Sequence, residues 1–149
     1  MATKSAPSTA TVPAPRINRI RMASLGALTM LIIQFVLGTA YAIYGTAPAS
    51  GKPIGMFSSP LLAVHVVMGI LLIIAAFMLV IRAIQARVTP LIVTSVVGLV
   101  VILGAFGAGS AFAGSGSDGA SLGMAVATAV AMLAYAASLV IAGQPRADR

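Results

Sequence analysis

The chain has 149 residues, of which 60% are hydrophobic and only 7% are charged. A soluble domain carries about one quarter charged residues, so a mean hydropathy of +1.09 excludes a water-soluble globule and indicates an integral membrane protein. The absence of cysteine excludes disulfides, thiolate metal sites and covalently attached c-type haem. Asp118 and Asp148 are the only acids, and this scarcity of carboxylates closes off most catalytic chemistry.

The two ends of the chain are predicted to be tails outside the folded part. Residues 1–15 are rich in Ala, Ser, Thr and Pro and show no apolar periodicity, as is typical of disorder. A cluster of arginines follows, so residues 1–21 are predicted to form one disordered basic tail. Residues 143–149 form a second, shorter tail.

The segment 22–142 is predicted to be a single membrane domain. It contains apolar runs that are long enough to cross a hydrocarbon core of about 30 Å at about 1.5 Å per residue. The runs cover residues 22–44, 59–82, 89–113 and 120–142. Since Gly, Pro and short polar links separate them, consecutive helices are expected to be antiparallel neighbours. The predicted fold is therefore all-α, an integral membrane antiparallel four-helix bundle that contacts the lipid bilayer.

The first run permits a second interpretation. Its basic start, its apolar stretch and the small-residue pattern Ala40-Tyr41-Ala42 resemble a cleavable secretory signal. However, the run is longer than the usual apolar region of about 7–15 residues in such signals. It also contains Gln34 and is needed to complete the bundle. A membrane span is therefore the favoured interpretation.

The distribution of basic residues predicts the orientation. Four spans place most of the basic residues on one side of the membrane and leave Lys52 and Asp118 on the other. The basic residues of the first side are Arg16, Arg19, Arg21, Arg82, Arg87, Arg146 and Arg149. Lysine and arginine are enriched in cytoplasmic loops, so both termini are expected in the cytoplasm and the protein in the inner membrane of the cell. These residues end apolar runs and form no continuous patch with aromatics, which argues against nucleic acid as a partner.

The sequences of the two halves of the domain are weakly similar to each other. The sequence VLGTA at 36–40 corresponds to ILGAF at 102–106. Counting from the starts of the helices that follow places His65 opposite Met124. This pattern favours two related helix hairpins, although alanine-rich apolar helices also align with one another by chance.

His65 is the only histidine, and it lies about 7 Å below the outer end of the run 59–82. An ionisable residue inside a span is costly and marks a candidate functional site. Gly69 lies one turn deeper on the same face and leaves space for a flat cofactor. Neutral imidazole is a common ligand of metals and of haem. The alternative is a histidine that hydrogen-bonds to a neighbouring helix or to water, which residue chemistry alone favours.

A resemblance adds to this picture. The sequence QFVLG at 34–38, the Gly-rich outer loop and LLAVHVVMG at 61–69 resemble one half of a haem A synthase. The similarity covers residues 22–142 and implies that His65 ligates a haem. It also implies that Gln34 and Gly38 pack in the helix that faces this histidine.

The departures from that family limit what the resemblance implies. A four-helix half in the family has a second histidine in its last helix and uses an outer glutamate, and this chain has neither residue. Haem A synthase activity is therefore not expected, and no catalytic residue is assigned. The resemblance still allows a b-type haem, held by His65 with Met124, by His65 alone, or by two copies of His65 in a homodimer. The alternatives are no cofactor at all and a Met124 side chain that packs in the bundle or faces lipid.

A second functional class needs no cofactor. The protein would then be a structural or accessory subunit that packs on a partner in a membrane complex. The pairs Gly104/Ala108 and Ala105/Gly109 have the small-xxx-small spacing that lets membrane helices approach closely.

Overall fold

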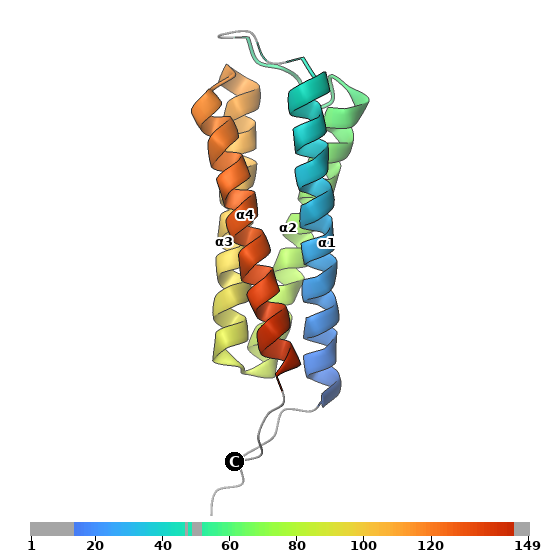
Figure 1. Ribbon diagram of the computed structural model, residues 1–149, viewed down its shortest axis with the longest axis vertical. Helices are drawn as coiled ribbons and strands as arrows, with labels where there is room; N and C mark the ends of the chain where they lie inside the picture. The colour runs from blue at the N-terminus through green and yellow to red at the C-terminus, as the bar shows by residue number, and fades with distance from the viewer. Residues whose placement is uncertain (1–13, 47, 49–51, 145–149) are drawn as a thin grey trace, which may run out of the picture.

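The structure is a computed structural model that describes residues 14–46, 48 and 52–144. The predictions for residues 1–13 and 145–149 fall outside this range. Four helices follow one another: α1 (Ala14–Tyr44), α2 (Pro60–Ala86), α3 (Thr89–Ser115) and α4 (Asp118–Gly143). Each helix packs against the next, and α4 packs back against α1, so the helices form an antiparallel ring (Figure 1). The predicted all-α antiparallel four-helix bundle is confirmed.

Each of the four helices is long and apolar enough to cross a membrane. Large Leu, Ile, Val and Phe side chains cover the outside of the bundle and are exposed. Such a continuous apolar surface would drive aggregation in water but suits lipid. The chain is therefore a small multi-pass membrane protein with four spans.

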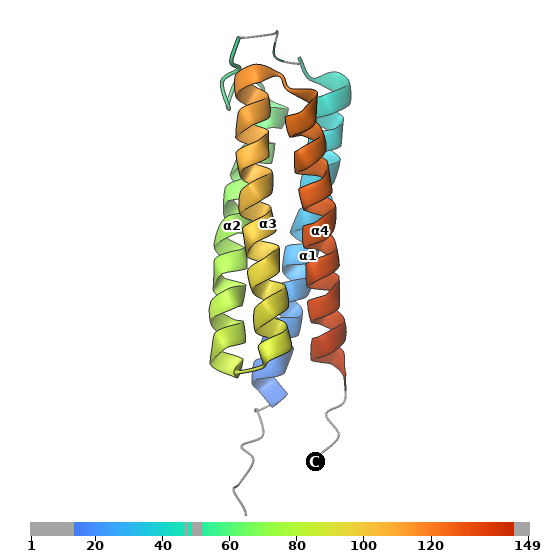
Figure 2. The ribbon, with the colours of Figure 1, turned by 90° about the vertical axis from the view of Figure 1, so that its left-hand side faces the viewer.

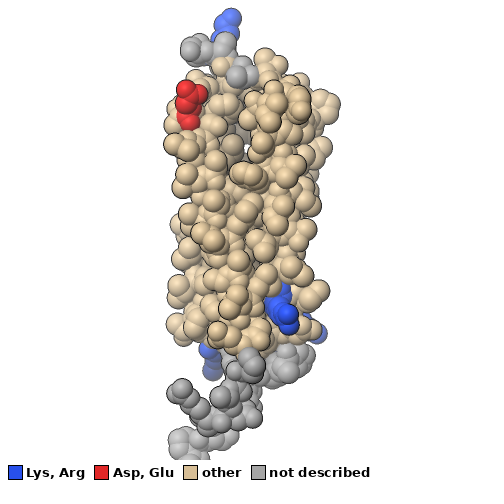
Figure 3. Space-filling view, viewed as in Figure 1, with Lys and Arg blue, Asp and Glu red and all other residues tan. Residues whose placement is uncertain are grey.

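The bundle has two distinct ends. At the terminal end, α1 begins, α4 stops and a short turn joins α2 to α3 (Figure 2). At the loop end, the connection 45–59 joins α1 to α2, and Gly116 and Ser117 join α3 to α4. Figure 3 shows basic side chains at the terminal end, with acidic and basic side chains at the loop end and an uncharged band between.

Local sequence signals account for the helix boundaries. The Ser59 side chain accepts a hydrogen bond from the Leu62 N–H at 3.2 Å, and Pro60 occupies the first turn of α2, where no N–H is required. Ser117 caps α4 in the same way. Gly116 ends α3 with a φ of 68°, a left-handed conformation that glycine adopts without strain.

The start of α1 differs from the prediction of a tail that extends to residue 21. The helix already begins at Ala14. Its first turns are ordered because Ile17 and Ile20 continue the helical spacing of buried residues, and Ile20 is only 1% exposed. Arg16 also donates a hydrogen bond to the Gln85 carbonyl oxygen of α2 at 3.4 Å. The apolar contacts of Ile17 and Ile20, and the long side chain of Arg16 that reaches the end of α2, therefore stabilise a helix that begins before the arginine cluster.

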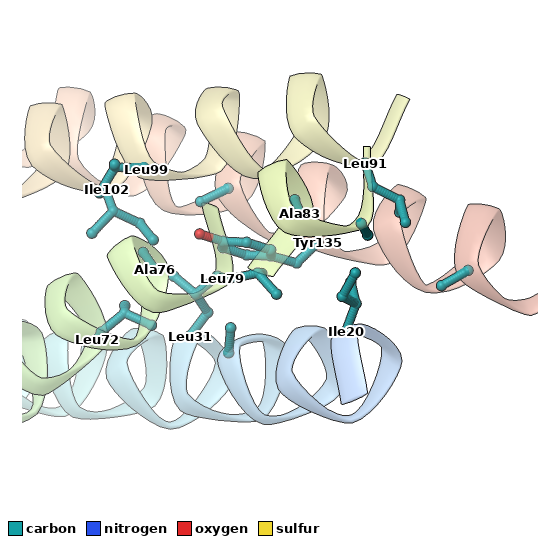
Figure 4. Close-up of a cluster of buried hydrophobic side chains, with 14 residues drawn as sticks. Ile20, Leu31, Leu72, Ala76, Leu79, Ala83, Leu91, Leu99, Ile102 and Tyr135 are labelled. Carbon is teal, nitrogen blue, oxygen red and sulfur yellow. The ribbon is translucent and has the colours of Figure 1, made fainter. Parts of the chain in front are cut away.

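The terminal half of the bundle is tightly packed around Tyr135 of α4, which is fully buried (Figure 4). A Cβ atom at Gly98 of α3 would lie 2.7 Å from Tyr135 Cζ, so only glycine admits the ring at this position. Leu31, Leu72 and Ile102 close this core toward the loop end, where they also line a cavity.

Candidate functional site

A cavity of about 230 Å³ occupies the loop-end half of the bundle. All four helices contribute to its largely apolar wall. It brings together every residue that the sequence singled out as a candidate site residue. These residues are Gln34, Gly38, His65, Gly69 and Met124. An apolar cavity with a few convergent polar groups is the usual form of a small-molecule site.

The imidazole of His65 on α2 packs against Gly38 on α1. A Cβ atom at position 38 would lie 3.1 Å from His65 Cε1 and 3.7 Å from Nδ1, so any larger residue would have to displace the ring. Nδ1 is buried and has no hydrogen-bond partner among the described residues. A buried polar atom without a partner is costly. Because Nδ1 is covered by α1, a ligand in the cavity would have to bind the other ring nitrogen, Nε2.

Gln34 ties α1 to α2 at the same level. Its Nε2 donates a hydrogen bond to the backbone carbonyl oxygen of His65 at 2.8 Å. Gly69 makes room for this amide, because a Cβ atom there would lie 3.1 Å from Nε2. The sequence suggested that Gly69 leaves space for a cofactor beneath His65, whereas its contact in the structure is with Gln34. The Gln34 Oε1 atom is buried without a partner in the described part of the chain.

Met124 enters the cavity from α4. A Cβ atom at Gly109 of α3 would lie 3.2 Å from its Sδ atom, so a glycine accommodates Met124 as Gly38 accommodates His65. In both hairpins, therefore, a glycine on the first helix faces the candidate ligand on the second. Over the described residues α2 and α4 do not pack on each other, which makes them diagonal partners in the ring. His65 and Met124 thus project into one cavity from diagonally opposite helices.

Two glycines proposed for partner packing have different surroundings. Gly109 faces the interior and Met124. Gly104 is exposed, and a Cβ atom there would meet nothing within 4 Å. The sequence could not separate the two, because small residues occupy several faces of α3.

The connection 45–59 contributes residues that the sequence did not single out. The Ile54 N–H donates a hydrogen bond to the Ala113 carbonyl oxygen of α3 at 2.9 Å. Ile54 and Met56 consequently line the cavity at its loop end. No local pattern marks this contact, since it depends on a hydrogen bond between distant parts of the chain.

Two other polar groups near the loop end differ in their relation to the site: Asp118 does not line the cavity, whereas Tyr41 does. Asp118 is exposed in the first turn of α4, where the positive end of the helix dipole stabilises its carboxylate. The Tyr41 hydroxyl donates to the Thr46 carbonyl oxygen at 3.0 Å. Within the described ranges, no group of three or more His, Asp or Glu side chains could hold a metal ion. A free metal ion at His65 would therefore lack further side-chain ligands of these types among the described residues.

The fold and the cavity define a small four-span membrane protein with one histidine in an apolar internal pocket. No family model, curated protein or solved structure matches the chain.

Proposed function

We propose that the protein binds one b-type haem in the loop-end cavity, with His65 as a ligand of the iron. The observation that carries this proposal is the half-buried His65 ring, which lines an apolar cavity between four helices and whose Nδ1 has no partner among the described residues. The resemblance of residues 34–38 and 61–69 to half of a haem A synthase supports it.

The chemistry of the cavity favours haem over a free metal ion. A metal ion held by protein side chains alone commonly needs three or four of them. A porphyrin supplies four nitrogens of its own, so one imidazole from the protein suffices as an axial ligand. The apolar wall suits the flat, mostly apolar face of such a group, and Gly38 leaves the space that the His65 ring requires.

Met124 is the residue that would supply a second ligand to the iron. It shares the cavity with His65 but comes from the diagonally opposite helix, an arrangement in which bundle proteins build cofactor sites between helices. A haem with histidine and methionine ligands supplies one-electron transfer at a raised reduction potential. We therefore propose a role in electron transfer rather than in catalysis. Because His65 faces the interior, a haem shared between two copies of the chain would require the bundle to open.

The orientation follows from the charges. The described arginines Arg16, Arg19, Arg21, Arg82 and Arg87 belong to the terminal end of the bundle. By the enrichment of basic residues on the cytoplasmic side, we propose that this end faces the cytoplasm and that the haem cavity lies toward the outer face.

The proposal is tested by the absorption spectrum of the purified protein. After expression with added haem and purification in detergent, we expect a Soret band and about one haem per chain, as one cavity with one histidine requires. A colourless protein that also fails to take up haem in titration would contradict the proposal. That outcome would favour the accessory subunit, for which the open surface at Gly104 and Gly107 offers a packing face.

A further inference from the structure

The cavity has a side opening between α1 and α4. The two helices pack closely in the terminal half, where Ile20 and Ala131 are buried, and they separate toward the loop end (Figure 1). On α1, Phe35, Thr39 and Ala42 line the cavity and are also exposed on the outside of the bundle. Figure 3 shows a hollow in this face near the loop end.

The opposite edge of this opening is formed by α4. Ala125 lines the cavity and is exposed, so it lies at the rim. Its methyl group is small, and its neighbour one turn earlier, Ser121, is also small. The rim on α4 therefore leaves the opening wide, while Phe35 on α1 gives it an aromatic border at the level of the lipid chains.

The route from the loop end is more obstructed. Ile54 and Met56 line the cavity there, Met56 with an exposed side chain at the rim, and the hydrogen bond from Ile54 to Ala113 holds this segment against α3. Pro48 is buried, and a Cβ atom at Gly116 would lie 2.8 Å from its carbonyl oxygen. In the described parts of the connection, Pro48 and Ile54 therefore lie against the end of α3, whereas no described segment crosses the gap between α1 and α4.

We propose that haem reaches the cavity from the bilayer, through the gap between α1 and α4. This inference rests on the proposed function, and it identifies the source of the ligand as haem dissolved in the membrane. The side route lets the apolar ring pass from lipid into an apolar cavity without crossing water, which avoids exposing its surface to water. The side route also brings the haem ring past Ala125 toward His65 without moving the connection 45–59.

A substitution at the rim tests the route. The variant Ala125→Phe places a ring in the opening, and Ala129→Phe is the matched control, since Ala129 is exposed one turn away and outside the cavity. Each protein is reconstituted in vesicles and mixed with vesicles that carry haem in their bilayer. We expect uptake, followed at the Soret band, to slow roughly tenfold in Ala125→Phe and not in the control. Equal uptake rates in both variants would overturn the proposed route.

A second readout does not require haem. The chain has no tryptophan, so Phe112→Trp places a single reporter in the cavity wall. We expect lipids with brominated acyl chains to quench this reporter, and Ala125→Phe to reduce the quenching while Ala129→Phe does not. Quenching by acrylamide from water, with no dependence on Ala125, would overturn the side opening. If the wild-type protein binds no haem but this lipid quenching depends on Ala125, the proposed function fails while the opening itself stands for lipid-soluble molecules.

Discussion

Replacement of His65 with glycine is expected to weaken haem binding strongly, and added imidazole is expected to restore it. His65 is the only histidine of the chain, so no second imidazole can take its place. The side chain removed leaves a space beside Gly38 in which free imidazole can bind and ligate the iron. We expect haem affinity to fall roughly 100-fold, measured by titration at the Soret band.

The control for this experiment is Ser110→Ala. Ser110 also lines the cavity, but its hydroxyl donates only to the Phe106 carbonyl oxygen of its own helix, at 3.0 Å. We expect this variant to bind haem like the wild-type protein. Haem that stays bound with an unchanged spectrum in His65→Gly would show that another group ligates the iron.

Replacement of Gly98 with leucine is expected to destabilise the bundle strongly. A first side-chain carbon at this position would already lie 2.7 Å from Tyr135 Cζ and 2.9 Å from its hydroxyl oxygen. Because Tyr135 is fully buried, its ring has no open space to move into. Overpacking of this kind costs about 1–3 kcal/mol in the free energy of unfolding. Unfolding in detergent mixtures, followed by circular dichroism, measures the loss.

The matched control is Gly104→Leu on the same helix. A Cβ atom at Gly104 would meet nothing within 4 Å, so the free energy of unfolding should change little. In the double variant with Tyr135→Leu, the smaller buried side chain should recover part of the stability lost in Gly98→Leu, a coupling expected of residues in direct contact. Equal losses in the two glycine variants would contradict the structural role assigned to Gly98.

The architecture could be predicted from the sequence because lipid imposes simple requirements. Each span needs a long apolar run, and short links force neighbouring spans to be antiparallel. The start of α1 was harder to predict, since the arginines that mark the membrane edge do not mark the end of a helix. There, the burial of Ile20 decides the outcome, and burial depends on the other helices.

Some of the residues that line the cavity could also be predicted from the sequence. Counting residues from the loop end places His65 and Met124 at similar depths, and both line the cavity. Gln34, which the resemblance singled out, lines it as well. Their individual contacts could not be anticipated, because these depend on how each helix is rotated about its axis. Gly69 meets Gln34 and Gly109 meets Met124 only because the helices turn those faces inward. Small residues on several faces of α3 give no sign of that rotation.

The contact between Ile54 and Ala113 shows a second limit of sequence reasoning. The connection 45–59 contains glycines and prolines, which predict turns but not where the segment goes. Its return across the loop end depends on a backbone hydrogen bond to α3, which any residue type at these positions could form. The pattern of side chains in the sequence therefore does not predict such a contact.

The position of the iron in the haem-loaded protein tests the central claim most directly. An anomalous difference map, recorded from crystals at the iron absorption edge, locates the metal without any assumption about its ligands. The proposed function predicts one iron peak inside the loop-end cavity, within coordination distance of a His65 ring nitrogen and on the side of the cavity that faces Met124. An iron peak away from His65, or no iron peak in haem-treated crystals, would contradict it.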